Sequence, residues 1–152
     1  MQNISKILVD ADACPVKDEI VQVGTKFHVE ILFVASYAHR SRKQQGNWIY
    51  VDSEQDEVDF YIYKNAKATD LVITQDMGLA GLLVKKGVYV LSPRGTFVTD
   101  EQMDTILYSR YVSAKLRRQG TYTKGPKSFS KHDRQCFFTS LEKILSNYKG
   151  IH

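Results

Sequence analysis

The chain has little cysteine and no long apolar run. Its 152 residues include only two cysteines, Cys14 and Cys136, which are too few for a disulfide framework or a cysteine zinc site. No stretch approaches the roughly 20 apolar residues of a membrane span, and Lys6 and Asp10 lie within or beside the first short apolar run, unlike in a signal peptide. We therefore expect a soluble protein of the reducing cytoplasm, with residues 1–152 forming a single domain.

Acidic residues are scarce in the last third of the chain. Residues 107–152 contain ten Lys or Arg against two Asp or Glu, whereas residues 1–106 contain 11 against 15. The net charge of +4 therefore combines an acidic body with a basic C-terminal arm at about residues 107–152. Such an arm beside clustered carboxylates is typical of a protein that holds a polyanion. A solvated basic helix is the alternative.

Short apolar runs alternate with helical patterns before this arm. The runs are residues 7–9, 29–35, 48–51, 71–74 and 88–91, and the helical patterns are residues 15–26, 57–68 and 77–86. Continuous apolar strands separated by helices predict an α/β fold of three α/β/α layers, in which helices cover both faces of a mostly parallel sheet. Pro15 is expected in the first turn of its helix. Capping boxes at Thr99 and Ser130 predict two C-terminal helices.

Several aspartates fall where a parallel sheet collects its ligands. Asp10 ends the first strand and Asp76 follows the fourth by two residues, so both belong at the carboxyl edge. Asp59 lies near the start of a helix among apolar side chains. If the three converge, each pair of charges about 5 Å apart repels by roughly 3 kcal/mol at an effective dielectric of about 20. Carboxylates without soft ligands suit Mg²⁺ or Mn²⁺, which would offset this repulsion.

Two of the acids have structural alternatives, and a third is expected to have no catalytic role. Asp10 would otherwise cap the helix near Pro15, and Asp12 is either a further ligand or the N-cap acceptor of the same helix. Asp70 precedes its strand and belongs at the opposite edge, where we expect it to face solvent.

Four motifs together resemble the YaiI/YqxD family of bacterial proteins. They are VDADACP from Val9, DLVITQD from Asp70, SPRG from Ser92 and GPKSFSKHDRQCF from Gly125. The family is similar to PIN-domain nucleases, in which acids at the strand ends bind Mg²⁺ or Mn²⁺ for phosphodiester cleavage. The resemblance thus implies a PIN-like fold and a nuclease acting on RNA or single-stranded DNA.

Carried over by position, the resemblance assigns the metal to Asp10, Asp59 and Asp76. In the nuclease hypothesis these three aspartates are catalytic, and Asp12 is a fourth catalytic residue that assists through a water. Thr74 of the T-x-D turn is predicted to bind phosphate. A PIN domain also supplies an acid from a helix after the second strand, but residues 36–48 contain none. Asp52 or Glu54 would have to come from a different element, and this departure puts a two-metal site in doubt.

Basic residues of two motifs are candidates for the nucleic-acid backbone. Arg94 follows the fifth strand at the carboxyl edge, where it either contacts phosphate or pairs with an acid. Lys127, Lys131 and Arg134 lie in the loop and first turn of the last helix, whose N-terminus favours anions.

Two other functions remain open. ILVDADA also reads as a haloacid-dehalogenase phosphatase motif, with Asp10 as nucleophile and Asp12 as general acid. A non-catalytic module that binds nucleic acid or protein would keep the fold without the full acid set. The sequence does not specify the oligomeric state.

Overall fold

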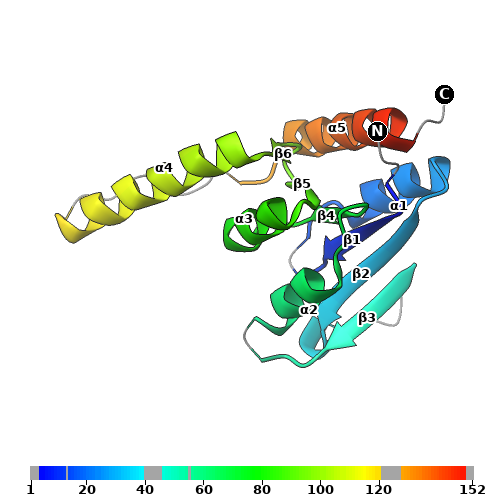
Figure 1. Cartoon of the computed structure of the whole chain (residues 1–152), viewed down its shortest axis with the longest axis horizontal. Helices are drawn as coiled ribbons and strands as arrows, with labels where there is room; N and C mark the ends of the chain where they lie inside the picture. Colours follow the sequence, from blue (N-terminus) through cyan, green and yellow to red (C-terminus); the bar gives the residue numbers. More distant parts are fainter. Residues whose placement is uncertain (1–3, 13, 40–45, 55, 121–127, 150–152) are drawn as a thin grey trace.

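A central six-stranded sheet organises the part of the chain that the structure describes (Figure 1). This computed structural model describes residues 4–12, 14–39, 46–54, 56–120 and 128–149. The strands are β1 (Lys6–Asp10), β2 (Glu30–Ser36), β3 (Asn47–Val51), β4 (Leu71–Ile73), β5 (Tyr89–Leu91) and β6 (Phe97–Val98). The helices are α1 (Lys17–Lys26), α2 (Glu57–Asn65), α3 (Met77–Lys86), α4 (Asp100–Arg118) and α5 (Lys131–Lys149), and a 3-10 turn, η1, spans Tyr37–His39.

The strand order creates a switch point at the middle of the sheet. The strands lie in the order β3-β2-β1-β4-β5-β6, and all neighbours are parallel except β5 and β6. From β1 the chain first builds outward through β2 and β3, and then returns to the other side of β1 with β4. Ligand sites of open α/β sheets lie at such a reversal, beyond the carboxyl ends of the strands.

Helices cover both faces of the sheet, as the apolar strands require. On one face, α1 and α5 pack against side chains such as Ile7 and Val9. On the other face, α2 and α3 pack against Leu8, Val34 and their neighbours. Successive residues of a strand point to opposite faces, so β1 contributes to both cores and is apolar at its three central residues, 7–9. The prediction of a three-layer α/β/α fold is confirmed.

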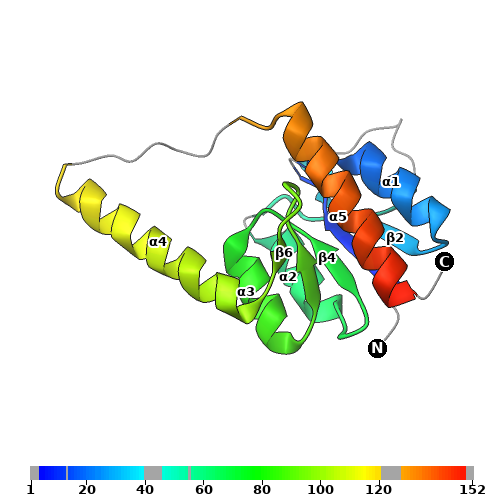
Figure 2. The same cartoon turned by 90° about the horizontal axis from the view of Figure 1, so that it is seen from above.

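The two C-terminal helices differ in how they meet this body. Helix α5 lies beside α1, whereas α4 projects away from the sheet in both views (Figures 1 and 2). Within α4, Met103 is the only buried side chain. Gly95 lets the chain pass close to α5, because a Cβ there would lie 2.8 Å from the backbone of Cys136, and its φ is +93°. The Ser140 hydroxyl donates to the Gly95 carbonyl at 2.8 Å.

Local signals were confirmed at the ends of the later helices. Thr99 accepts a hydrogen bond from the backbone of Gln102, and Ser130 and Asp133 form a reciprocal capping box. The prediction for Pro15 was wrong, because α1 begins at Lys17 and Val16 is its N-cap. The antiparallel edge strand β6 was not predicted. Among the described residues, no helix is long and apolar enough to cross a membrane.

Asp70 corrects another prediction. It precedes β4 at the edge opposite the candidate site, as expected, but it does not face solvent. Only 1% of its surface is exposed, and it accepts a hydrogen bond from the Lys67 backbone and pairs with Lys6 at 3.5 Å. Its partners make it a structural residue.

Candidate functional site

Asp10 and Asp76 meet at the switch point through a single threonine. Asp10 is the last residue of β1, and Thr74 and Asp76 follow β4, the strand paired with it. The Thr74 hydroxyl donates to Asp10 Oδ2 at 2.9 Å and accepts from the backbone N–H of Asp76 at 3.0 Å. Thr74 is 1% exposed, so its hydroxyl orients the two aspartates from inside the fold.

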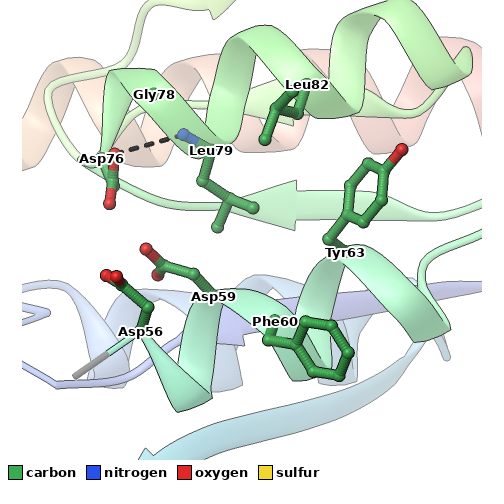
Figure 3. Close-up of a pocket in the computed structure, with 8 residues that line it drawn as sticks. All are labelled: Asp56, Asp59, Phe60, Tyr63, Asp76, Gly78, Leu79 and Leu82. Carbon is green, nitrogen blue, oxygen red and sulfur yellow. Dashed lines mark hydrogen bonds between the residues drawn. The ribbon is translucent and has the colours of Figure 1, made fainter.

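Asp76 also begins the next helix. It is the N-cap residue of α3, and its Oδ1 accepts from the backbone N–H of Leu79 at 3.2 Å. This cap fixes the carboxylate at the positive end of the helix dipole. Its second oxygen, Oδ2, is the one turned toward the neighbouring acids in Figure 3.

Asp12 is fixed by β2 and not by α1. Both of its carboxylate oxygens lie within hydrogen-bond distance of the Ser36 backbone N–H, at 3.2 and 3.3 Å. The N-cap residue of α1, Val16, makes no side-chain capping bond. The hydrogen bonds described for Asp10 and Asp12 go to Thr74 and to Ser36, and none of these bonds caps α1.

Asp59 completes the group from α2. Figure 3 shows Asp59 and Asp76 pointing toward one another across the space between α2 and α3. Burial and a hydrogen bond to Asp76 raise the pKa of Asp59 to about 7, with repulsion from Asp76 and Asp10 adding to the effect. Burial opposes ionisation of Asp76 as well, but the hydrogen bond from Asp59 and backbone N–H groups outweigh it and lower the pKa of Asp76. Below about pH 7, Asp59 therefore keeps its proton while Asp76 is ionised.

The pKa of Asp10 is raised as well. Burial raises its pKa to about 6, the Thr74 hydrogen bond opposes the rise, and the charges of Asp12 and Asp76 add to it. These mutual effects show that the four aspartates are close enough to interact. The sequence analysis expected Asp10, Asp59 and Asp76 to converge, and in the structure the charge of each lies near at least one of the others.

The four aspartates line a cavity of about 450 Å³, which we call the acidic pocket. Three further acids line it: Glu54, Asp56 and Glu57. Sequence reasoning had considered Glu54, whereas it missed Asp56 and Glu57. Their signal was the acidic run around the start of α2, DSEQDEVD, which places several carboxylates near one helix N-terminus.

The donor chemistry of the acidic pocket fits a hard divalent cation. Its carboxylate oxygens are the ligands that Mg²⁺ and Mn²⁺ prefer, and the neighbouring acids add to the effect of burial in raising the pKa values of Asp10 and Asp59. No three His, Cys, Asp or Glu side chains among the described residues are already arranged to hold an ion. An ion here would therefore use one or two carboxylates with several waters, as Mg²⁺ commonly does, or would draw Asp59 away from Asp76.

Three of the predicted phosphate-binding residues, Arg94, Lys131 and Arg134, lie in or beside the first turn of α5, and two of them have acidic partners. Arg94 pairs with Asp133 at 2.7 Å, and Arg134 pairs with Glu19 at 2.9 Å. Lys131 is exposed in the first turn of α5. Lys127 lies outside the described residues. Arg94 also lines a second cavity, which adjoins the acidic pocket at Gln75.

Comparisons with known proteins give a consistent family. Residues 8–147 match a family model described as "Uncharacterized BCR, YaiI/YqxD family". The chain is 96% identical over 151 residues to a UPF0178 protein of Bacillus cytotoxicus, which covers 99% of each chain. It is 48% identical over 147 residues to a UPF0178 protein of Bacillus velezensis, covering 95% of this chain and 88% of the relative. A UPF0178 protein of Listeria monocytogenes is 47% identical over 148 residues, covering 97% and 99%. No solved structure matches the chain.

Proposed function

Since the chain belongs to the YaiI/YqxD family, as its motifs predict, we propose that it is a PIN-like, divalent-metal-dependent nuclease of the bacterial cytoplasm. Its reaction is hydrolysis of phosphodiester bonds in RNA or single-stranded DNA. The observation that carries the proposal is the meeting of Asp10, Asp59 and Asp76 at the switch point, where burial and the neighbouring carboxylates raise the pKa values of Asp10 and Asp59. A phosphate is itself an anion, so this site needs a cation to accept one.

The residues of the acidic pocket divide the work. Asp10, Asp59 and Asp76 would hold the ion once Asp59 has left its hydrogen bond with Asp76, and Asp12 would assist through a water. When bound, Mg²⁺ or Mn²⁺ supplies a Lewis acid for a phosphoryl oxygen and lowers the pKa of a bound water. Because the Thr74 hydroxyl is engaged with Asp10 and with the Asp76 backbone, we give Thr74 a positioning role in place of the phosphate contact expected from the motif.

The basic residues of α5 and the SPRG loop guide the phosphate backbone. Arg94 and Arg134 are held by Asp133 and Glu19, and pairs of this kind fix the position of a guanidinium, whose planar group suits phosphate. Lys131 adds charge at the helix N-terminus, and Lys127 is assigned to the same path from the motif alone.

The test is cleavage of labelled single-stranded RNA with and without Mn²⁺. Cleavage by the wild-type protein, lost with EDTA and in Asp10→Asn, supports the proposal. Asp18→Asn is the matched control, because Asp18 is an exposed acid of α1 outside the acidic pocket and is expected to retain full activity. Equal cleavage by Asp10→Asn and the wild type would assign the activity to a contaminant and end the proposal.

One observation favours a second candidate, a non-catalytic PIN-like module that binds nucleic acid or protein. The absence of a ready three-ligand group among the described side chains is expected of such a module. Binding of single-stranded RNA without cleavage at any Mg²⁺ or Mn²⁺ concentration would support it. The phosphatase alternative fits less well, because only residues 11–16 separate β1 from α1 and leave no room for the flap of that enzyme class. Release of phosphate from a small phosphomonoester would support the phosphatase alternative.

A further inference from the structure

An apolar groove between α2 and α3 opens next to the acidic pocket (Figure 3). It has a volume of about 520 Å³, within the range of small-molecule sites. Three large apolar side chains line it and remain exposed: Phe60 at 64%, Leu82 at 55% and Tyr63 at 40%. Burying one such side chain stabilises a protein by about 1.5–3 kcal/mol, so a group of them left in water indicates a surface with a ligand.

The groove and the acidic pocket are continuous. Asp56, Asp59 and Asp76 line both of them. In Figure 3 these carboxylates lie at one end of the groove, and Phe60 and Tyr63 follow along the same side on α2. A ligand with an anionic group at the acidic pocket would therefore extend an apolar group over Phe60.

The far end of the groove is basic. Lys86 ends α3, and its Nζ lies 4.9 Å from the centre of the Tyr63 ring and donates to the Tyr63 carbonyl. Lys85 precedes it in the same exposed turn. The sequence of surfaces is thus acidic, aromatic and basic, which matches a metal-bound phosphate, a base and a following phosphate.

A protein partner fits this groove less well. Covering the groove with an apolar protein surface would also take Asp59 and Asp76 out of water, which is costly without a cation. Protein interfaces are depleted in aspartate for this reason. A nucleotide brings its phosphate and cation to these carboxylates and needs only a planar platform for its base.

We propose that the groove binds one base of a single-stranded nucleic acid, stacked on the Phe60 ring beside the phosphate at the acidic pocket. This inference deepens the proposed function and depends on it for the identity of that phosphate. In a duplex both faces of a base are stacked on its neighbours, so Phe60 can act only on an unpaired base. The groove would therefore select single-stranded substrates.

Binding of two fluorescent strands tests the inference. One strand is an eight-nucleotide oligothymidylate, and the other is the same strand with an abasic sugar at every position. Anisotropy is measured with Mn²⁺, and strand integrity is checked after each titration. We expect Phe60→Ala to weaken binding of the thymidine strand by about 5–150-fold, the range for one stacked base, without changing binding of the abasic strand.

Control variants separate stacking from other effects. Phe60→Trp keeps a ring and should bind like the wild type, whereas Tyr108→Ala removes an aromatic side chain of α4 that is 69% exposed and lies outside the groove. Phe60 is also exposed, so its replacement should leave the free energy of unfolding unchanged. Mn²⁺ affinity without DNA should be equal in all variants.

Several results would overturn the inference. These are equal binding of both strands by the wild type, unchanged thymidine binding by Phe60→Ala, or no binding of either strand. A dimer that Phe60→Ala dissociates without affecting DNA binding would make the groove an interface between copies. If Phe60→Ala cleaves RNA as the wild type does, the proposal of base stacking in the groove is refuted and the nuclease proposal is not. If the protein binds the thymidine strand in a base-dependent way but cleaves nothing, the nuclease proposal is refuted and base stacking is not.

Discussion

Replacing Asp10 with Asn should stabilise the metal-free protein at neutral and alkaline pH. Burial raises the pKa of Asp10 from 3.8 to about 6. A pKa higher in the folded than in the unfolded state means that the folded protein holds the proton more tightly. Its contribution to stability is therefore full below pH 3.8 and is lost as the pH rises through about 6. Two pKa units correspond to about 3 kcal/mol, which is the most that ionised Asp10 subtracts from the free energy of unfolding above pH 7.

Asparagine removes this charge and leaves an oxygen that can accept the hydrogen bond from Thr74. We expect Asp10→Asn to raise the free energy of unfolding by about 2–3 kcal/mol at pH 8 and to change it little at pH 4. The assay is urea denaturation in EDTA at both pH values. Saturating Mn²⁺ should favour the wild type, because a ligand of the folded state stabilises only a protein that binds it.

Asp133→Asn is the control of opposite sign. Hydrogen bonds from the backbone and side chain of Ser130, together with Arg94, lower the pKa of Asp133. That contribution to stability is present above the unfolded pKa and is lost as the pH falls, so this variant should be less stable than the wild type at pH 8. If Asp10→Asn is also less stable at pH 8 in EDTA, the carboxylates of the acidic pocket do not oppose one another and the reasoning fails.

The remaining predictions concern the ion, the threonine and the loop beside α5. Mn²⁺ affinity, measured by calorimetry, should rise with pH through about 7 and level off near pH 8, because Asp10 and Asp59 must lose their protons; a flat profile from pH 5 to 8 would contradict this. Thr74→Val should raise the pKa of Asp10 further and lower the free energy of unfolding by about 1–3 kcal/mol at pH 7, as urea denaturation and an NMR titration would report. Gly120→Ala should cost about 1–2 kcal/mol for its positive φ, and Gly95→Ala should cost more because its Cβ would also meet the backbone of Cys136; equal midpoints in urea would refute the collision.

The fold could be predicted because a buried parallel sheet leaves a strong signal. Its strands have to be apolar on both faces, and the runs that became β1, β2 and β4 are nearly unbroken. Strand β6 has two residues and lies at an edge, so it offers no such pattern. The start of α1 was misplaced by two residues because Pro15 fits a first helical turn in sequence, whereas the helix begins after Val16 without a side-chain cap.

The site could be predicted only in part. Asp10 and Asp76 follow strands, and strand ends of a parallel sheet share an edge, so sequence position was sufficient for them. Arg94 and Arg134 were expected near phosphate, but their partners lie 39 and 115 residues away in the chain. Pairings over such separations depend on how α5 packs against α1 and the SPRG loop, which no local pattern specifies.

The two edges of the sheet treat a buried acid in opposite ways, and this contrast supports a cation at the acidic pocket. At one end of β4, Asp70 is 1% exposed and has Lys6 and a backbone N–H beside it. At the opposite edge of the sheet, Asp10 at the end of β1 accepts a hydrogen bond from the Thr74 hydroxyl and lies near the charges of Asp12 and Asp76. The same sheet therefore neutralises an acid where it serves stability and gathers acids at the switch point, where their repulsion lowers stability. Structure alone gives no reason for the second arrangement, whereas binding a divalent cation does, because the repulsion in the empty pocket becomes attraction for the ion.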